Sequence, residues 1–553
     1  MSKKKSSLLI SVIAPVVILA GGIAAYIYIK SSESSFNPLG SAKLVPKTAL
    51  MATYIDTKPE SWNQLKKFGT PEAQKIIGKG LQDWNGQIFK DTTISYEKDI
   101  QPWVGGIMIA LLPADDKKTS QVNLPNSQEP NILVVVDIKD KIAALNFANK
   151  LKQQKNVNVK TQELDYKGEK IIETKGQGES TYITVLNNNH LLFTSNKQAV
   201  EKAIDTWKGE ASFATKAGAN EILSKGADVK NSLAQVYIPD YGNIVEKITA
   251  LNPQSPKLPP QTLAQIKQVK SLVAGVGVDD MGLRFKAVVN LDPELNKFEY
   301  QTTPAKIVGQ FPSETFALAS GQGINKSWQT FVAESKDYPD LNQGLQQART
   351  QLKTLQIDLD QDIFSWMTGE FGIGAIQSNQ GLLANVGFGG ALVLDTSDRK
   401  TAEATFTKLD NFARQSFNVA NKNIGGKNVT EWQIPQQGAL ISHGWLDNDT
   451  AFLAIGGPIA ETLANRKGQA LDQTDNFKKV TGSLQTPNAG YFYLDMEKTT
   501  TIIQRLSTQS QPLPPDATAI LNSIRGLGVT FHSPNKSMTQ MEMLFALKPA
   551  SGK

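Results

Sequence analysis

The sequence contains no cysteine in 553 residues and only three histidines, His190, His443 and His532. The absence of cysteine excludes disulfide bonds, thiolate metal sites and cysteine nucleophiles. A metal site built on imidazole alone would need all three histidines to converge. These absences remove several classes of enzyme before any motif is considered.

The chain also lacks any concentration of basic charge beyond residues 1–30. That segment holds four lysines and no acid, and the rest of the chain has 54 basic against 52 acidic residues. Nucleic-acid binding needs a concentrated basic face, because each phosphate contact is an electrostatic one. We therefore expect no nucleic-acid partner.

Length and composition are typical of a folded protein with more than one domain. Hydrophobic residues make up 40% of the chain and charged residues 20%, as in folded rather than disordered proteins. With roughly 150 residues in a typical domain, the chain is too long for one small core.

Charge is absent from the 22 residues that run from Leu8 to Ile29. At about 1.5 Å per residue, a helix of this length spans a hydrocarbon core of about 30 Å. Three lysines at 3–5 precede the run, whereas only Lys30 follows it closely. The positive-inside rule therefore predicts a cytoplasmic N-terminus and an exported body.

The alternative is a signal peptide that is cleaved after export. The charged start fits, and Ile23-Ala24-Ala25 resembles a small-residue cleavage site. The uncharged run continues past that site, which favours an anchor. We therefore assign residues 1–30 to a cytoplasmic N-terminus and transmembrane anchor, and 31–43 to a tether.

The remainder of the chain repeats itself. The order of landmarks in residues 44–295 recurs in 304–550, and the offset between the halves falls only from 266 residues at Trp62 to 251 at Gly275. The landmarks are the tryptophan pairs Trp62/Trp328 and Trp103/Trp366 and the aspartate pairs Asp99/Asp362, Asp137/Asp395, Asp140/Asp398 and Asp240/Asp495. We predict two tandem homologous α/β modules, at 44–300 and 301–550.

Each module has the pattern of a mixed α+β fold. The aliphatic runs ILVVVDI and ALVLD predict buried strands, and helical spacing of apolar residues follows each of them. Turn residues then predict hairpins at Gly168 and Gly426, and at 187–189 and 447–449. Because hairpins join antiparallel neighbours, we expect mainly antiparallel sheets.

The duplicated aspartates are the strongest candidates for chemistry. Paired carboxylates perform acid–base catalysis when their surroundings separate their pKa values. Asp140, Asp398, Asp240 and Asp495, however, stand where a strand gives way to a helix, and aspartate is a preferred N-cap. We interpret these four as caps.

The histidines and tryptophans receive structural interpretations. The repeat places Thr450 opposite His190, so none of the three histidines is repeated, and each lies near a predicted turn or strand end. The repeated tryptophans could line a groove, but large aromatic side chains more often anchor cores, and we predict core positions for Trp62, Trp103, Trp328 and Trp366.

Asp358, Asp360 and Asp362 resemble the start of a calcium loop. Such a loop needs glycine at its sixth position and glutamate at its twelfth, where this chain has Ile363 and Gly369. We interpret the segment as the end of a helix before a strand. The sequence has no G-x-S-x-G or H-E-x-x-H motif, and we predict no catalytic, cofactor-binding or metal-binding residues.

Three segments carry a resemblance to a known family. They are PKTALMATYID (46–56), SWNQLKKFGTPEAQK (61–75) and YEKDIQPWVGG (96–106). With them the chain resembles an uncharacterised cyanobacterial membrane-anchored family with a tandem domain of unknown function. The resemblance implies a body on the periplasmic or thylakoid-lumenal side of a membrane. It implies no catalytic residues.

The sequence leaves three functions open. The first is a non-catalytic, membrane-tethered binding or assembly protein with protein partners at the membrane, because tethering raises the effective concentration of such partners. The second is a carrier or chaperone for a lipid or another apolar ligand. The third is a hydrolase that uses the duplicated aspartates.

Overall fold

The computed structural model describes nine segments of the chain, residues 36–88, 94–113, 131–152, 160–175, 180–250, 260–296, 300–466, 468–507 and 513–550. The predicted transmembrane segment, the cytoplasmic N-terminus and the first part of the tether lie outside them. Within these nine segments, every helix is too short or too polar to cross a bilayer.

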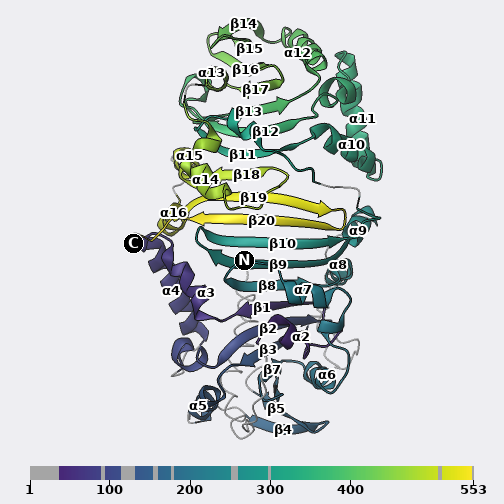
Figure 1. Cartoon of the computed structure of the whole chain (residues 1–553), viewed down its shortest axis with the longest axis vertical. Helices are drawn as coiled ribbons and strands as arrows, with labels where there is room; N and C mark the ends of the chain where they lie inside the picture. Colours follow the sequence, from purple (N-terminus) through teal and green to yellow (C-terminus); the bar gives the residue numbers. More distant parts are fainter. Residues whose placement is uncertain are drawn as a thin grey trace. The chain divides into compact units, whose positions relative to one another are not determined.

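The described residues form two compact units. Unit 1 comprises the described parts of Met1–Lys66, Gln74–Asp279 and Phe285–Asp292. Unit 2 comprises Lys67–Ala73, Asp280–Arg284 and the described part of Pro293–Lys553. Each unit is built on its own set of strands, with helices at the strand ends and on the sheet faces (Figure 1).

The strands of unit 1 are β1 (Met51–Asp56), β2 (Val104–Leu112), β3 (Asn131–Ile138), β4 (Lys160–Tyr166), β5 (Glu169–Lys175), β6 (Thr181–Leu186), β7 (His190–Thr194), β8 (Ser232–Ile238), β9 (Val269–Asp279) and most of β10 (Gly282–Leu291), whose first residues, Gly282 to Arg284, belong to unit 2. Their order in the sheet is β10-β9-β8-β1-β2-β3-β7-β6-β5-β4.

The strands of unit 2 are β11 (Thr315–Gln322), β12 (Glu370–Gln377), β13 (Phe388–Asp395), β14 (Asn418–Ile424), β15 (Lys427–Ile434), β16 (Gly438–Trp445), β17 (Thr450–Ile455), β18 (Tyr491–Asp495), β19 (Ile524–Asn535) and β20 (Met538–Leu547). Their order is β20-β19-β18-β11-β12-β13-β17-β16-β15-β14. Each strand stands where its counterpart, ten strands earlier in the chain, stands in unit 1.

Every pairing whose register is defined among the described residues is antiparallel. The α+β class with mainly antiparallel sheets is therefore confirmed. The hairpins turn where the sequence predicts them. Gly168 and Gly426 have φ values of 80° and 83°, and Asn187 and Asn188 have 54° and 52°, left-handed angles that glycine and asparagine adopt most easily.

The helices of unit 1 are α2 (Pro38–Ala42), α3 (Pro59–Gln64), α5 (Lys141–Lys152), α6 (Lys197–Trp207), α7 (Ala219–Lys225), α8 (Tyr241–Ala250) and α9 (Pro260–Lys267), and α4 (Pro71–Ile88) begins in unit 2 and continues into unit 1. Those of unit 2 are α10 (Ile324–Ser335), α11 (Pro339–Thr354), α12 (Arg399–Ala413), α13 (Gly457–Asn465), α14 (Asp475–Thr481), α15 (Met496–Ser507) and α16 (Pro515–Asn522). The short turns η2 (Tyr96–Ile100), η4 (Lys306–Gln310) and η5 (Leu359–Phe364) complete the elements used below.

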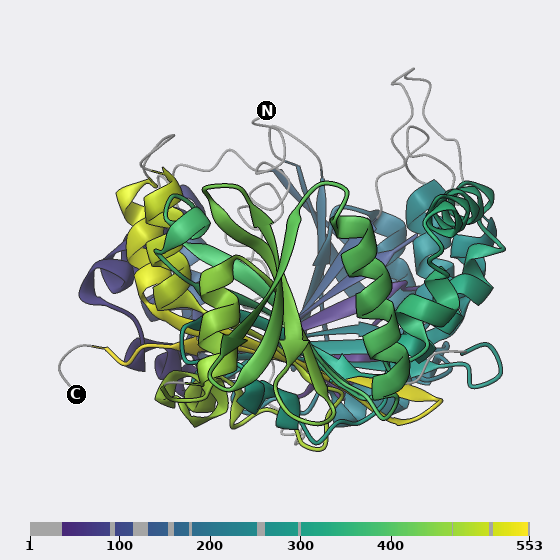
Figure 2. The same ribbon diagram turned by 90° about the horizontal axis from the view of Figure 1, so that it is seen from above.

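Both faces of each sheet carry apolar side chains. In β13, Ala391 and Val393 pack into the main core with α13 and α14, whereas Leu392 and Leu394 point to the opposite face and contact α12. Successive strand residues point to opposite faces, so an uninterrupted aliphatic run supplies both. Figure 2 shows helices on both sides of the unit 2 strands.

Candidate functional site

A buried carboxylate lies at the end of β3, in the core of unit 1. The side chain of Asp137 is fully buried. Its Oδ1 accepts a hydrogen bond of 2.8 Å from Ser41 Oγ, and its Oδ2 accepts one of 3.0 Å from Tyr54. His190, opposite Asp137 in β7, places Nε2 at 3.5 Å from Oδ1. Strands β1, β3 and β7 and helix α2 thus bring four polar side chains together, and we call them the Asp137 cluster.

Burial separates the pKa values of this cluster. Burial raises the pKa of Asp137 to about 6, although hydrogen bonds from Ser41 and Tyr54 favour its ionised form. Burial lowers the pKa of His190 to about 4, so its imidazole is neutral at neutral pH. The pKa of Tyr54 is raised by burial and then by the charge of Asp137, which keeps its hydroxyl protonated as a donor.

Unit 2 has a related carboxylate at the end of β13. Thr450 lies opposite Asp395 in β17, as His190 lies opposite Asp137, and its hydroxyl donates a hydrogen bond of 2.8 Å to Oδ1. Burial raises the pKa of Asp395 to about 6, and the negative charge of Glu370 adds to the rise. Thr450 and His190 thus each lie opposite an aspartate across a pair of antiparallel strands.

The space beside these two aspartates is filled differently in each unit. In unit 1, Gly106 lies opposite Asp137, and any Cβ at Gly106 would overlap the hydroxyl end of Tyr54. In unit 2, strand β12 begins with Glu370. Its buried carboxylate accepts a hydrogen bond of 3.0 Å from the N–H of Ile307 at η4. Unit 1 therefore places a phenol beside its aspartate where unit 2 places a second carboxylate.

A second pair of aspartates forms the same motif twice. Asp99 accepts hydrogen bonds of 2.7 and 2.8 Å from Lys150, and its Oδ2 accepts the N–H of Ser95 at 2.7 Å. The indole N–H of Trp103 donates to the carbonyl oxygen of Asp99 at 2.8 Å. Burial opposes ionisation of Asp99, but the bonds from Lys150 and Ser95 outweigh it, so its pKa lies below its ordinary value.

Unit 2 contains the same set of contacts at similar distances. Asp362 binds Lys408 at 2.7 Å and accepts the N–H of Asp358 at 2.7 Å. The indole of Trp366 donates to the carbonyl oxygen of Asp362 at 3.0 Å. In both units the motif fixes the short turn before a strand, η2 or η5, against the following helix, α5 or α12. The aspartate in each case serves to hold the turn and is bound to a lysine.

The remaining duplicated aspartates cap helices, as the sequence indicates. Asp140 accepts the N–H of Ala143 at 2.9 Å, Asp398 that of Thr401 at 3.1 Å and Asp240 that of Asn243 at 3.3 Å. A side-chain oxygen at this position satisfies an N–H that the first helical turn leaves unpaired.

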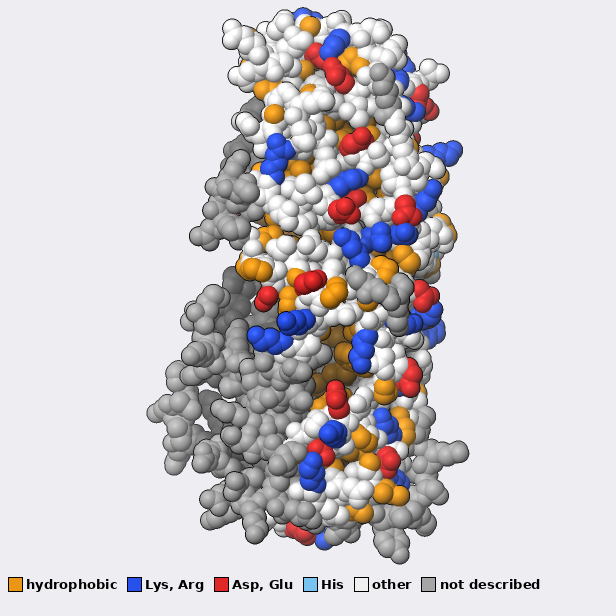
Figure 3. Space-filling model, turned by 90° about the vertical axis from the view of Figure 1, so that its left-hand side faces the viewer, with side chains coloured by type: hydrophobic (Ala, Val, Ile, Leu, Met, Phe, Trp, Pro, Cys, Tyr) orange, Lys and Arg blue, Asp and Glu red, His pale blue; other side chains and the backbone are white. Residues whose placement is uncertain are grey.

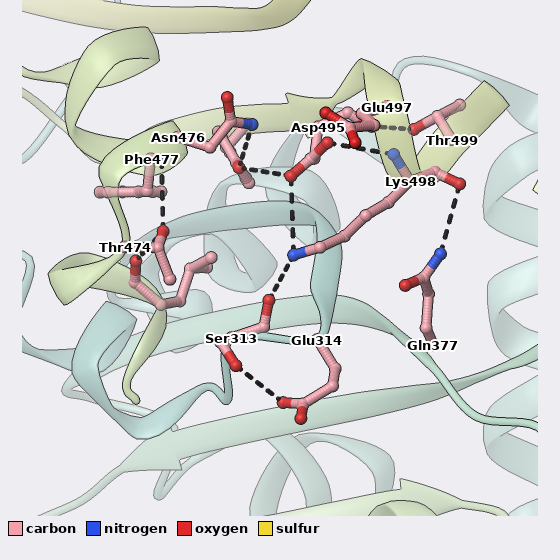
Figure 4. A network of polar contacts seen from close by, with 12 residues as sticks. Ser313, Glu314, Gln377, Thr474, Asn476, Phe477, Asp495, Glu497, Lys498 and Thr499 are labelled. Carbon is pink, nitrogen blue, oxygen red and sulfur yellow. Dashed lines mark hydrogen bonds and ion pairs between the residues drawn. The ribbon is translucent and has the colours of Figure 1, made fainter. Parts of the chain in front are cut away.

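The fourth cap, Asp495 at the start of α15, lies in a larger network. It accepts the N–H of Lys498 at 3.1 Å, and the ammonium group of Lys498 lies 3.5 Å from its Oδ2. Figure 4 shows the Lys498 side chain reaching from α15 to Asp495 and to the carbonyl oxygen of Ser313. Gln377 of β12 donates to the carbonyl oxygen of Lys498 at 3.4 Å, so the network fastens α15 to the neighbouring strands.

Two of the four tryptophans occupy the predicted core positions. Trp103 and Trp366 are buried, but Trp62 is 43% exposed, so the core prediction for Trp62 is wrong. Its indole N–H donates to the carbonyl oxygen of Asp56 at 2.6 Å, which holds the ring at the surface. Trp328 is half-buried and stacks on Phe364 with a centroid distance of 4.0 Å.

His443, which has no counterpart histidine in the repeat, forms a pair with Asp410 that the sequence does not reveal. It lies inside β16, and Nε2 is 2.8 Å from Oδ1 of Asp410 in α12. Phe406 stacks on the imidazole at a centroid distance of 4.5 Å, and Trp432 donates to the same Asp410 oxygen. These contacts attach α12 to the sheet, so His443 has a structural role, although it lies within a strand.

The segment that resembles a calcium loop begins a helical turn. Asp358 caps η5 by accepting the N–H groups of Asp360 and Gln361, and this short helical turn ends at Phe364, before β12. Asp360 binds Arg349 at 2.8 Å, and Asp362 binds Lys408. Across the described segments, no group of three or more acidic or imidazole side chains is arranged to hold a metal ion.

A chemically uniform surface lies on the second face of the unit 2 sheet, the face to which Leu392 points. Two adjacent rows of side chains cross seven strands there, and cross-strand neighbours in each row are defined by the register. The first row is Met543, Val529, Phe492, Ala319, Ile373, Leu392 and Leu453, and the second is Phe545, Leu527, Leu494, Ala317, Ala375, Gly390 and Ile455. We call these fourteen residues the apolar strip.

The apolar strip contains no polar side chain, and three of its members are open to solvent, whereas Leu392 packs against the cluster that includes α12. Ile373 is 54% exposed, Ile455 49% and Phe492 41%, and the other members are half-buried. Helix α15 lies at one end of the strands and α10 and α11 at the other (Figures 1 and 2). The open face of an antiparallel sheet is ordinarily polar, so an apolar face of this extent is unusual.

Hydrophobic side chains are also grouped on the side of the molecule drawn in Figure 3. They line a recess there, between charged residues of both signs. Elsewhere on that side they are scattered singly, as on most protein surfaces.

Comparison with known proteins places the chain in a family. A model of the family described as protein of unknown function, DUF3352, matches residues 10–547. The chain belongs to this family. The resemblance to a family with a domain of unknown function is thereby confirmed. No curated protein matches the chain.

Among solved structures, the chain is similar to two crystal forms of TP0453. Crystal form IV is 9% identical, with a TM-score of 0.27, and the match covers 45% of this chain and 80% of that chain. Crystal form III is 9% identical, with a TM-score of 0.26, and the match covers 45% and 79%. Similarity at this level carries no inference about function.

Proposed function

We propose that this protein is a non-catalytic, membrane-tethered binding protein of the extracytoplasmic side, built from two copies of one α+β module. The apolar strip of unit 2 is the single observation that carries the binding role. A continuous apolar surface in contact with water is unfavourable, because burial of apolar area contributes about 25 cal/mol per Å². A partner that covers the strip recovers this free energy.

The proposal of two copies has independent support from contacts. The strand order is the same in both units, and the Asp99–Lys150–Trp103 motif recurs as Asp362–Lys408–Trp366 with distances that agree within 0.2 Å. Unrelated modules would not be expected to share both a ten-strand order and a side-chain motif at the same place in it.

The geometry gives no support to an aspartate-dependent hydrolase. Asp137 is fully buried among Ser41, Tyr54 and His190 in the core, whereas Asp99 is bound to Lys150 of α5. A catalytic pair needs a common opening to substrate, and the two carboxylates have separate partners on separate elements.

A photo-crosslinking amino acid tests the binding role. We would replace Ile373 by benzoylphenylalanine in the full chain, in its native membrane, and replace Ile142 as the matched control, since Ile142 is 69% exposed on α5 and lies outside the strip. We expect light-dependent adducts of added mass at Ile373 and none at Ile142. Absence of adducts at Ile373, and also at Ile455 and Phe492, would overturn the proposal.

The orientation needs its own experiment. Protease added from the cytoplasmic side of sealed vesicles should leave both units intact, and protease added from the opposite side should cut them. Digestion of the units from the cytoplasmic side would contradict the positive-inside assignment.

A further inference from the structure

We propose that the apolar strip of unit 2 binds the hydrocarbon chains of a membrane lipid. This inference rests on the proposed function and narrows it to one class of ligand. The central strands of the strip are β18, β11, β12, β13 and β17. Helices α15, α10 and α11 lie beyond the strand ends, and α12 packs beside Leu392 at one end of the strip.

The composition of the apolar strip favours a ligand without hydrogen-bonding groups. None of the fourteen side chains donates or accepts a hydrogen bond. The five central strands are each paired on both sides, so their backbone N–H and C=O groups are used within the sheet. A peptide that binds by adding a strand needs a free sheet edge, and the strip offers none.

The dimensions of the apolar strip match those of extended hydrocarbon chains. With neighbouring strands about 4.8 Å apart, the rows across seven strands are about 29 Å long. The two rows are separated by two residues along each strand, about 7 Å. A single leaflet of a bilayer contributes about half of a hydrocarbon core of about 30 Å, so one row is long enough for a complete acyl chain.

The chain itself indicates the source of such a ligand. The uncharged run from Leu8 to Ile29 ends seven residues before Phe36, the first described residue. Residues 38–42 form α2 and pack into unit 1, so only the six residues 30–35 separate the run from the described fold. Six residues span at most about 22 Å, so unit 1 stays close to the bilayer that the run is predicted to cross. For a tethered protein, membrane lipid is the apolar partner with the highest local concentration.

The test uses the full chain in vesicles that contain a small proportion of a phospholipid with a diazirine in its acyl chain. After illumination, labelled peptides are identified by mass spectrometry. We expect labels on β12, β17 and β18, in addition to those on the membrane segment. Labels confined to the membrane segment would overturn the proposal.

Matched variants separate the strip from general lipid contact. Ile373→Lys places a charge in the centre of the apolar strip, and Ile142→Lys places one at an exposed position on α5. Labelling of the strip should fall at least about tenfold in Ile373→Lys and stay unchanged in Ile142→Lys, because a charge loses its hydration beneath a hydrocarbon chain. Equal labelling of the two variants would contradict the proposal.

Folding and the identity of the partner are controlled separately. Ile373→Ala, with circular dichroism to confirm native structure, should reduce labelling by a smaller factor, since only part of the apolar contact is removed. If benzoylphenylalanine at Ile373 yields a protein adduct while the diazirine lipid labels no strip residue, the lipid assignment is wrong and the binding role stands. If neither reagent labels the strip, both proposals fail.

Discussion

The hydroxyl of Tyr54 donates a hydrogen bond of 3.0 Å to Oδ2 of Asp137 in the core of unit 1. The two residues are 83 positions apart in the chain and lie on β1 and β3. Because Asp137 is fully buried, this donor and Ser41 replace the water that an exposed carboxylate would bind.

Replacing Tyr54 by Phe removes one donor from the ionised carboxylate. We expect a loss of about 1.5–3 kcal/mol in the free energy of unfolding at pH 7.5, the usual range for hydrogen bonds to charged groups. The loss should be smaller at pH 5, where Asp137 is mostly protonated. Chemical denaturation at both pH values measures it. Tyr182→Phe, which removes a half-buried bond to Glu173, is the control and should cost less.

Replacing Asp137 by Asn should flatten the pH dependence of stability between pH 4 and pH 7. The pKa of Asp137 is about 6 in the folded state, above an unfolded value of about 3.9. The folded state therefore holds the proton more tightly, and this contribution is complete below pH 4 and is lost as the pH rises through 6. The difference is on the order of 2–3 kcal/mol. Thermal unfolding from pH 4 to 7.5 measures it, and parallel curves for wild type and variant would contradict the assignment.

Replacing His190 by Gln should change the same profile in the opposite sense. The folded pKa of His190 is about 4, below an unfolded value of about 6.5. Stability from the neutral imidazole is therefore present above pH 6.5 and is lost as the pH falls toward 4. We expect the variant to lose less stability on acidification than wild type, by roughly 2–3 kcal/mol at pH 4. A variant that loses as much as wild type would show that His190 is protonated in the folded protein.

Replacing Lys150 or Lys408 by Met tests the repeated motif. Each lysine binds an aspartate at 2.7 Å, but the lysine side chains are 39% and 41% exposed. Solvent screening therefore limits the expected loss to about 0.5–1 kcal/mol for each variant. If the units are copies, the two losses should agree within about 0.5 kcal/mol in chemical denaturation. A loss confined to one unit would show that the motif has diverged in function.

The sequence alone predicts the local features well. Hairpin turns at Gly168 and Gly426 and caps at Asp140 and Asp398 depend on neighbours a few residues away, so short patterns identify them. The alternation within β13 also follows from composition, because an aliphatic run must supply both sheet faces.

Short sequence patterns do not predict the features that depend on strand register. Nothing near Tyr54 in the chain indicates that its hydroxyl meets Asp137, since the contact arises from the order β1-β2-β3. The apolar strip is also hidden in the sequence, because runs such as ALVLD predict buried strands whether or not a helix covers both faces. The burial of Trp62 was wrongly predicted because its hydrogen bond to Asp56 outweighs a general preference for cores.

The arrangement beside Asp137 and Asp395 has a consequence for how this chain can evolve. Gly106 leaves room for the Tyr54 ring in unit 1, and Glu370 fills the corresponding place in unit 2. A side chain larger than hydrogen at Gly106 is tolerated only after Tyr54 has become smaller, and Tyr54 cannot be lost without removing a donor from Asp137. If the units descend from one module, their cores followed separate routes that no single substitution can now exchange.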